Sequence, residues 1–244
     1  AVSLRGVTKR FGDGPNVLED VSLDVAEGEF VCLLGASGCG KSTLLNLAAG
    51  LDQPTAGTVE VPGVRAALMF QEPALFPWLT ASQNVELALR LCGVGRRDRR
   101  ARAAELLELV RLRGAGTKRV HELSGGMRQR VAMARALAQD SPVLLMDEPF
   151  AALDAITRDV LHEELVRLRE SQKLTVLFVT HNVREAVRLG DRVVLLSSRP
   201  GRIAKDYPVQ IAHPRRIEAP EVARLSMEIT DDLRTEIRRH GGQA

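Results

Sequence analysis

The chain has 244 residues, enough to bury one substantial core together with a subdomain. Hydrophobic residues make up 45% of it and charged residues 27%, with both signs interspersed, which is typical of globular domains. The formal net charge of +3 is too small to indicate a nucleic-acid or anionic-lipid partner. There is no basic-then-apolar signal segment, and no apolar run approaches the ~20 residues that span a bilayer. We therefore expect a cytoplasmic protein that does not itself span a membrane.

The three cysteines form no recognisable framework. Cys32, Cys39 and Cys92 match no zinc-binding spacing, and an odd number argues against a complete set of disulfides. We expect all three to be reduced thiols in a reducing compartment.

The N-terminal part of the chain predicts β-structure that leads into a helix. Residues 2–5 and 21–25 alternate apolar and polar side chains, with the period of half-exposed strands. Residues 30–34 are continuously apolar, as expected for a strand that is buried on both faces. The elements that we expect next, in chain order, are a helix over residues 41–49 closed by Gly50 and short strands at residues 58–61 and 66–70.

The rest of the chain predicts a helical insert and then a return to strands. Residues 81–138 have a helical texture, with an apolar face around Leu106 and Leu107. Strand and helix then alternate, because apolar strands are expected at residues 143–146, 175–179 and 192–196 and a helix at residues 155–169. This order implies a largely parallel sheet.

We expect a single domain over residues 1–244, in which a helical insert separates two halves of an α/β core. The core and its β subdomain comprise residues 1–71 and 140–205, the helical subdomain residues 72–139, and a C-terminal helical extension residues 206–244. A final helix over residues 220–239 carries an apolar stripe at four-residue spacing: Leu225, Ile229, Leu233 and Ile237. The stripe must cover either the core or a partner.

A glycine-rich segment follows the strand at residues 30–34 and fits the pattern G-x-x-x-x-G-K-[ST]. Its residues are Gly35, Ala36, Ser37, Gly38, Cys39, Gly40, Lys41 and Ser42. In such a loop the backbone N–H groups turn inward around phosphates, and the next helix N-terminus adds partial positive charge. Lys41 is placed to reach the β- and γ-phosphates, and the Ser42 hydroxyl to ligate Mg²⁺. A chance glycine-rich turn is the alternative, which the flanking strand and helix disfavour.

Two adjacent carboxylates, Asp147 and Glu148, follow the apolar strand at residues 143–146. Successive side chains of a strand point to different faces, so the two acids need not share a role. Asp147 suits a Mg²⁺ shell, and Glu148 is placed to accept a proton from an attacking water. A solvated acidic loop is the alternative, which the neighbouring phosphate loop disfavours.

A second candidate phosphate cradle lies at Ser124, Gly125 and Gly126. A helical pattern follows these residues, so they predict another helix N-terminus that is able to receive an anion. One chain rarely needs two such phosphate cradles for one nucleotide, so the presence of the second cradle is itself informative.

With these motifs the sequence resembles an ABC-transporter nucleotide-binding domain, from residue 2 to about residue 205. The resemblance implies a P-loop NTPase (RecA-like) α/β core with a mainly parallel sheet, an N-terminal antiparallel β subdomain and an inserted α-helical subdomain. It also implies ATP hydrolysis, with Mg²⁺ as the metal. In that family the Ser-Gly-Gly signature of one subunit completes the ATP site of the other, so a second subunit is implied, most simply as a homodimer.

The resemblance further implies roles for individual residues. Phe11 matches the aromatic residue that stacks on adenine, and Gln71 the glutamine that contacts Mg²⁺ and water. Asp154 lies in the loop that crosses the dimer interface, and His181 matches the histidine that contacts the γ-phosphate. The expected catalytic residues are Lys41, Gln71, Glu148 and His181, and the expected metal ligands are Ser42, Gln71 and Asp147. The expected nucleotide contacts are residues 35–42 with Phe11, Thr43, Gln71, Ser124, Gly125, Gly126, Gln129, Asp147 and Asp154.

The positions of these residues along the chain agree with such roles. Gln71 and His181 follow predicted strands, and ligands of open α/β sheets bind at the carboxyl ends of strands. A lone histidine after a strand is more often structural, but four strand ends here carry suitable chemistry in a suitable order. For Phe11 the alternative is an ordinary core residue.

Residues 71–79 are unusual because they contain the only tryptophan, Trp78, among prolines that hold the segment out of regular helix. Its apolar tip fits a contact with a helix of a membrane subunit, and packing inside the helical insert is the alternative. This segment, with residues 149–154 and 196–203, resembles importer ATPases of the nitrate, sulfonate and taurine group. The stretch between Gly57 and Gln71 is shorter than that group leads us to expect, so a peripheral strand or hairpin is expected to be missing.

The resemblance also implies partners. They are a transmembrane permease contacted near residues 72–79 and a solute-binding protein, with this chain peripheral on the inner face of the cell membrane. We expect no nucleic-acid partner, because the arginines of residues 96–102 have no interleaved aromatics and indicate a solvated helix start. The alternative function is that of a soluble, non-transport ABC ATPase of assembly or repair type.

Overall fold

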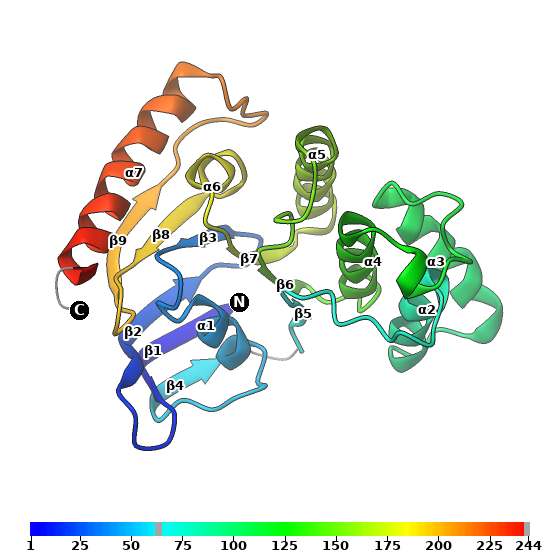
Figure 1. Ribbon diagram of the computed structural model, residues 1–244, viewed down its shortest axis with the longest axis horizontal. Coiled ribbons are helices and arrows are strands. Elements are labelled where there is room, and N and C mark those ends of the chain that lie inside the picture. The colour runs from blue at the N-terminus through cyan, green and yellow to red at the C-terminus, as the bar shows by residue number, and fades with distance from the viewer. Residues whose placement is uncertain (62–64, 242–244) are drawn as a thin grey trace.

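A six-stranded, mainly parallel sheet forms the centre of the protein (Figure 1). The computed structural model describes residues 1–61 and 65–241, with the backbone alone described at 240 and 241. The strand order is β5-β6-β7-β3-β8-β9, and the β8–β9 pair is antiparallel whereas the other pairs are parallel. The strands are β3 (Phe30–Leu34), β5 (Ala67–Met69), β6 (Val143–Asp147), β7 (Thr175–Val179), β8 (Arg192–Leu196) and β9 (Ile203–Pro208). The expected mainly parallel core is confirmed.

A second, antiparallel sheet has the order β2-β1-β4, with β1 (Val2–Arg10), β2 (Asn16–Val25) and β4 (Ala56–Glu60). It confirms the expected N-terminal β subdomain. Both β1 and β2 are longer than predicted, because register shifts around Val7 and Lys9 interrupt the alternation that marks a strand in sequence. Lys9 is buried in its strand, and its ammonium group donates to Asp52 Oδ1 at 2.6 Å.

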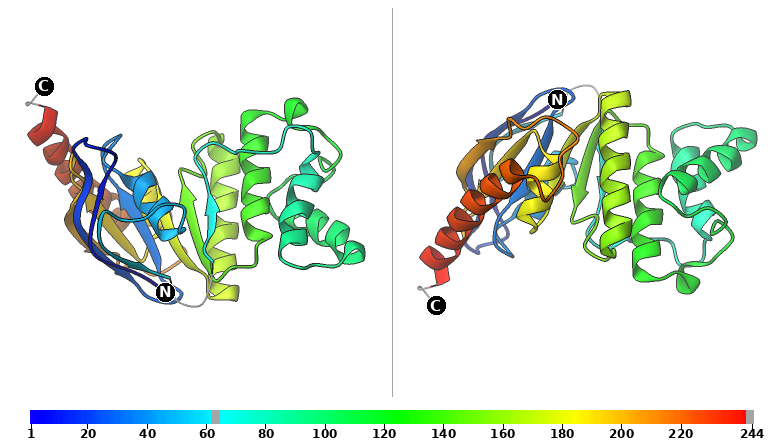
Figure 2. Two further views of the ribbon diagram at one scale, coloured as in Figure 1. Left: turned by 90° about the horizontal axis from the view of Figure 1, so that it is seen from below. Right: turned by 90° about the horizontal axis from the view of Figure 1, so that it is seen from above.

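Helices cover both faces of the large sheet. In chain order they are α1 (Lys41–Ala48), α2 (Ala81–Leu91), α3 (Arg96–Leu109), the short 3₁₀ helix η1 (Val120–Glu122), α4 (Gly125–Leu137), α5 (Ala155–Gln172), α6 (Val183–Leu189) and α7 (Pro220–Gly241). Helix α1 lies between the two sheets, where Leu44 and Leu45 share a core cluster with Leu18 and Leu33. Helices α2 to α4 extend as a lobe at one end of the molecule, and α7 lies at the other end (Figures 1 and 2).

The buried strands read as continuous apolar runs for a physical reason. Every residue of β3, β6 and β7 is buried, because α1 covers one face of the sheet and the larger core cluster, which contains residues of α4, α5 and α6, covers the other. Strand β9 was not predicted. It is an edge strand whose exposed charged residues hide the β pattern, and it pairs with β8 from Ile203 to Pro208.

The C-terminal helix α7 packs on the core. Ile229 is fully buried, and Leu225 and Leu233 pack against the larger core cluster, whereas Ile237 is 46% exposed. Tyr207 of β9 donates to Asp232 Oδ2 of α7 at 2.5 Å. Of the two alternatives for the apolar stripe, coverage of the core is therefore the one that the structure supports.

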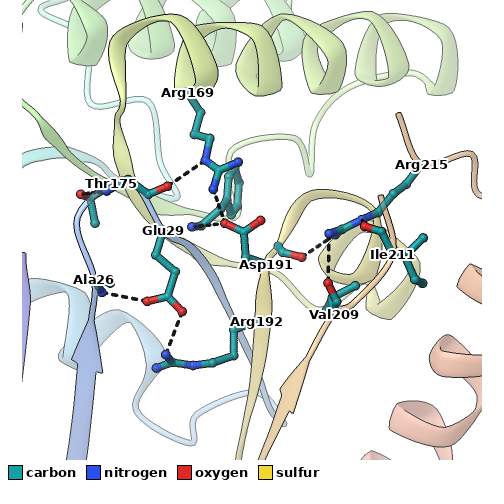
Figure 3. A network of polar contacts seen from close by, with 12 residues as sticks. Ala26, Glu29, Arg169, Thr175, Asp191, Arg192, Val209, Ile211 and Arg215 are labelled. Carbon is teal, nitrogen blue, oxygen red and sulfur yellow. Dashed lines mark hydrogen bonds and ion pairs between the residues drawn. The ribbon is translucent and has the colours of Figure 1, made fainter. Parts of the chain in front are cut away.

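Ion pairs join the amino ends of the parallel strands (Figure 3). Glu29, just before β3, binds Arg192 of β8 at 2.8 Å, and its other carboxylate oxygen accepts from the N–H of Ala26. Asp191, just before β8, accepts from the backbone N–H of Phe30 and from the guanidinium of Arg169 in α5. Helix α5 and strands β3 and β8 are thereby held together at this end of the sheet by paired charges.

Arg215 completes this network from the C-terminal segment (Figure 3). Its side chain is buried, and its guanidinium donates to four backbone carbonyls, those of Val187, Gly190, Val209 and Ile211. Two of these carbonyls close the C-terminal end of α6, where helix carbonyls lack partners within the helix. Burial lowers the pKa of the Arg215 guanidinium, although Asp191 nearby opposes this shift.

The remaining expectations concern the cysteines, membrane-spanning helices and the subdomain boundaries. Cys32, Cys39 and Cys92 are free thiols, as expected. Within residues 1–61 and 65–241, no helix is both long and apolar enough to cross a membrane. The subdomain boundaries at 71/72, 139/140 and 205/206 stay predictions. Residues 62–64, in the stretch expected to be short, lie outside the described residues.

Candidate active site

The candidate site lies where the parallel strands end. The carboxyl ends of β3, β5, β6 and β7 lead into Gly35, Gln71, Glu148 and His181, so four segments that are far apart in sequence meet at one edge. Side chains at this edge are free to face a ligand, because the backbone groups of the strands are already paired within the sheet.

The glycine-rich loop wraps around its own lysine. Gly40 caps α1 with φ of 98°, and a Cβ atom added there would lie 2.6 Å from Leu18 Cδ2, so this position admits only glycine without rearrangement. The Lys41 ammonium donates to the carbonyls of Gly35 at 2.8 Å and Ala36 at 3.0 Å. Lys41 is therefore held at the mouth of the loop, at the N-terminal end of α1.

A segment after β8 packs against the backbone of the glycine-rich loop. A Cβ atom added at Gly201 would lie 2.1 Å from the carbonyl oxygen of Cys39, so the two backbones are in close contact. Gly201 is also hydrogen-bonded to β2 through the N–H of Glu19 and the carbonyl of Val17. Residues 196–203 were noted above only for their likeness to a subfamily, and this contact was not predicted. The only sequence signal was the glycine itself after Pro200.

Ser42 and Asp147 form the expected oxygen-rich pair. Burial raises the pKa of the Asp147 carboxyl above its ordinary value, a shift that the nearby Ser42 hydroxyl opposes. A hydroxyl, a carboxylate and the carboxamide of Gln71 form the hard-oxygen donor set that Mg²⁺ prefers. These residues therefore fit the expected metal, although among the described residues no cluster of three acidic, histidine or cysteine side chains forms a ready-made cage.

Glu148 brings the polar side chains of three strand ends together. Its carboxylate oxygen Oε2 lies 3.2 Å from His181 Nδ1 and 3.5 Å from Gln71 Nε2. The backbone at Glu148 has a left-handed φ of 46°, which is unfavourable for a non-glycine residue. A hydrogen bond from its N–H to the carbonyl of Val179 at 2.9 Å holds this conformation in place.

Gln129 lies behind the site. It is buried, and its Nε2 donates to the backbone carbonyls of Gln71 at 3.4 Å and Glu148 at 3.5 Å. In this structure its amide thus joins helix α4 to two of the loops that converge on the site. Thr43, which follows Ser42 in the first turn of α1, is half-buried.

The second cradle begins α4, as predicted from its glycines. Ser124 caps this helix by accepting from the N–H of Met127 at 3.2 Å, and Ser124 and Gly125 are exposed. Gly126 lies against the loop after β6, because a Cβ atom added there would be 3.0 Å from the carbonyl oxygen of Ala152. The cradle is therefore open to solvent at the same side as the loop after Glu148.

Asp154 begins α5 on that loop. Its Oδ1 accepts from the N–H of Thr157 at 2.9 Å, and hydrogen bonds from Thr157 lower the pKa of Asp154. Its side chain is exposed, so it remains available to a second molecule.

Three aromatic residues stand exposed near these loops. Phe11 is 54% exposed at the end of β1, and the Lys9 ammonium lies 4.8 Å from its ring centroid. The alternative of a core residue is therefore wrong for Phe11. Trp78 is 65% exposed and stacks on Phe76 with ring centroids 5.5 Å apart, so packing of Trp78 inside the helical insert is also wrong. The arginines of residues 96–102 lie at the solvated start of α3, as expected.

Comparison with known proteins agrees with the geometry of the site. The family model described as "ABC transporter" matches residues 18–151. The "Taurine import ATP-binding protein TauB" of Sinorhizobium fredii is 50% identical over 210 residues, which are 83% of this chain and 79% of that protein. The "Aliphatic sulfonates import ATP-binding protein SsuB 1" of Mesorhizobium japonicum is 48% identical over 238 residues, which are 96% of this chain and 88% of that protein.

Solved structures share the fold. A structure described as a dimeric, post-hydrolysis state of the ATP-binding cassette MJ0796 bound to ADP and Pi superposes with a TM-score of 0.80. It is 35% identical and covers 87% of this chain and 100% of its own. A second dimeric structure of the same cassette has a TM-score of 0.79 at 34% identity, with the same coverage.

Proposed function

Because this chain belongs to the ABC transporter family and is an ATP-binding, ATP-hydrolysing subunit, we propose that it powers solute import through a separate membrane permease. The proposed solutes are small anions of the sulfonate, taurine or nitrate type, since relatives that are 48–50% identical are described as taurine and sulfonate import proteins. One observation of this structure carries the proposal: Glu148, Gln71 and His181 meet within hydrogen-bonding distance beside the phosphate loop.

Each residue at this edge has a distinct proposed role. Lys41 and the N–H groups of residues 35–42 bind the β- and γ-phosphates, and Phe11 offers its exposed ring to the adenine. Glu148 accepts the proton of the attacking water, and Gln71 orients that water. His181 donates to the γ-phosphate from the far side of Glu148.

The proposed metal is Mg²⁺, held by Ser42, Asp147 and Gln71. When bound, it neutralises charge on the β- and γ-phosphates. The influence of the Ser42 hydroxyl on the pKa of Asp147 supports the assignment, because it indicates that two oxygen ligands are neighbours. Gln71 is the one proposed ligand that also reaches Glu148.

We propose further that two copies of the chain form the working enzyme. Ser124, Gly125, Gly126 and Asp154 would then complete the ATP site of the other copy. The exposure of Ser124, Gly125 and Asp154 supports this arrangement, and so does the dimeric form of the related cassette structures. ATP binding between the copies would favour the closed dimer, and hydrolysis would release it.

The proposed permease contact lies at residues 72–79. There Trp78 and Phe76 form an exposed aromatic pair on a loop fixed by Arg119, which donates to the carbonyl of Trp78 at 3.0 Å. Arg135 of α4 donates to the carbonyls of Pro73 and Ala74. A fixed loop with an apolar tip suits a groove for a short helix of a membrane protein. The chain would then be peripheral on the inner face of the cell membrane, alongside a solute-binding protein in the full system.

Replacement of Glu148 by Gln tests the hydrolytic site. We expect ATP binding to persist and hydrolysis to fall by about 10²-fold or more, because a carboxamide accepts no proton from water. An unchanged hydrolysis rate would show that the proton-accepting role is misassigned.

Mixing two inactive variants tests the dimer. A Lys41→Ala copy and a Gly126→Val copy should each be inactive alone, whereas the mixed dimer contains one site in which both the loop and the signature are intact. Recovery of about a quarter of the wild-type rate or less is expected after random mixing. No recovery in a dimer verified by mass would contradict a site shared between copies.

The alternative of a soluble ABC ATPase of assembly or repair type is disfavoured by the import proteins among the relatives. Purification from membranes separates the two. Recovery of the chain with membrane subunits supports transport, and recovery only with soluble partners contradicts it. ATPase stimulation in the whole complex by sulfonates, taurine or nitrate would then identify the solute.

A further inference from the structure

A buried carboxylate lies behind His181. Glu185 is 5% exposed, and its two oxygens accept hydrogen bonds from the Thr180 hydroxyl and from Nε2 of His162 at 2.9 Å. His162 is 1% exposed, so the whole bridge from α5 to α6 is shielded from water.

One end of this bridge fixes the turn that carries His181. The Thr180 hydroxyl also accepts from the N–H of Asn182 at 3.0 Å, and Asn182 Oδ1 accepts from the N–H groups of Arg184 and Glu185. His181 therefore sits in a turn whose flanking residues are both hydrogen-bonded, although its own ring is 68% exposed.

The other end of the bridge reaches the loop that carries Glu148. The edge of the His162 ring packs against Phe150 with ring centroids 4.8 Å apart and an interplanar angle of 71°. Phe150 follows Glu148 by two residues and packs on Phe178 of β7. The His162 imidazole thus contacts the Glu148 loop directly through Phe150 and reaches the His181 turn through Glu185 and Thr180.

Packing alone leaves room between these loops. A pocket of about 50 Å³ has Glu148, Phe150, Thr180, His181 and Glu185 in its lining. Because side chains do not fill this space, the 3.2 Å contact between Glu148 and His181 depends on the polar bonds around it. The left-handed backbone of Glu148 adds to this dependence, since such a conformation persists only where the surroundings fix it.

We propose that His162 and Glu185 are positioning residues for hydrolysis: their buried hydrogen bond holds the Glu148 and His181 loops in register. The inference rests on the roles proposed above for Glu148 and His181. Neither His162 nor Glu185 faces the phosphate loop, so the bridge should govern the rate of the chemical step and leave ATP binding to residues 35–42.

Three variants of the full chain test the proposal. In Glu185→Gln one of the two donors loses its acceptor, and in His162→Leu the carboxylate loses one donor. Both should lower kcat by about 10- to 100-fold, the scale expected for a small displacement of catalytic groups, with KM for ATP within about threefold of wild type. His162→Gln keeps an N–H that reaches Glu185, and it should retain at least about a third of the wild-type kcat.

Tyr207→Phe provides a matched control. It removes one hydrogen bond to a carboxylate, Tyr207 to Asp232, at a contact between β9 and α7 that lies away from the site. Its kcat should equal that of wild type even where its melting temperature falls as much as that of Glu185→Gln. A loss of kcat in Tyr207→Phe that matched its loss of stability would assign the effects to general destabilisation and overturn the proposal.

The remaining outcomes are also decisive. A wild-type kcat in folded Glu185→Gln, or a kcat in His162→Gln as low as that of Glu185→Gln, would overturn the proposal. If His162→Leu does not fold, the contrast between Glu185→Gln and His162→Gln decides. Glu148→Gln distinguishes failure of the positioning proposal from failure of the proposed catalytic roles. If Glu148→Gln is inactive while Glu185→Gln is fully active, only the positioning proposal fails. If Glu148→Gln is active, the roles proposed for Glu148 and His181 fail.

Discussion

The two ends of the large parallel sheet use polar groups in opposite ways. At the amino ends, Glu29 pairs with Arg192, Asp191 pairs with Arg169, and Arg215 donates to backbone carbonyls (Figure 3). At the carboxyl ends, the Lys41 ammonium has its partners within its own loop, the carbonyls of Gly35 and Ala36 and the Cys39 thiol, and His181 is largely exposed. The same strands therefore begin at a network whose charges are paired without a ligand and end at a site that a ligand would complete.

The difference shows which polar residues belong to the fold and which to the chemistry. Burial of a charged group stabilises a fold only where partners are in place, and the amino end meets this condition. At the carboxyl end, Glu148 has a left-handed backbone, which is unfavourable for a non-glycine residue. Substitutions at the two ends should thus separate stability from activity.

Lys41→Ala at the carboxyl end should give the largest effect. We expect nucleotide affinity to fall by about 100-fold or more, because the cation that faces the phosphates is lost, while the melting temperature changes by about 2 °C or less. Calorimetric titration with a non-hydrolysable ATP analogue measures the affinity. Arg128→Ala removes an exposed cation from the start of α4 and should leave the affinity of the single chain unchanged. Equal losses in the two variants would refute the assignment of the loop.

Arg215→Met at the amino end should give the opposite result. Four carbonyls lose their buried donor, so we expect the free energy of unfolding to fall by about 3 kcal/mol. The kcat per folded molecule should stay at the wild-type value. Urea unfolding measures the change, and Arg216→Met, at an exposed neighbour, should change it by about 0.5 kcal/mol or less. A selective loss of kcat in Arg215→Met would break the comparison.

Glycine substitutions in the two phosphate cradles allow their effects on stability to be compared. Gly40→Ala forces a Cβ atom against Leu18 at a left-handed position and should destabilise the fold by about 1–3 kcal/mol. Gly125→Ala meets open space in the first turn of α4 and should be neutral or stabilising by about 0.5 kcal/mol. Thermal unfolding of both variants checks this. A destabilised Gly125→Ala would mean that the second cradle is as tightly built as the first.

Glu29→Gln should have the smallest effect. The amide still binds Arg192 or the N–H of Ala26, but the charge is lost, so we expect a loss of about 0.5–1 kcal/mol that shrinks at high salt. Denaturant titrations at low and high ionic strength measure it. A loss that salt does not reduce would indicate that shape, rather than charge, matters at this pair.

The sequence predicted what spacing along the chain determines. The loop of residues 35–42 and the pair Asp147 and Glu148 are local patterns, in which a strand, a turn and a few side chains suffice. Their convergence with Gln71 and His181 followed from the common edge of parallel strands. The order of strands and helices along the chain likewise predicted a parallel core and a β subdomain correctly. The ends of β1 and β2 were predicted wrongly.

What the sequence did not predict depends on contacts between distant residues. His162 and Glu185 are 23 residues apart and meet only because α5 and α6 pack together, and neither stands in a motif. The closeness of Gly201 to Cys39 depends on how the segment after β8 crosses the loop. Strand β9 was missed because an exposed edge strand carries charges where a buried one carries apolar residues.

Arg215 has a consequence for how the protein opens. Its guanidinium joins the last carbonyls of α6 to two carbonyls after β9, so neither segment can detach without releasing the other. The end of α6 and residues 209–219 should therefore behave as one cooperative unit in amide hydrogen exchange, with a shared opening free energy. Proteolytic cleavage of that segment would accordingly begin with the loss of a single side chain's contacts, and it would loosen the far end of the helix that starts beside His181.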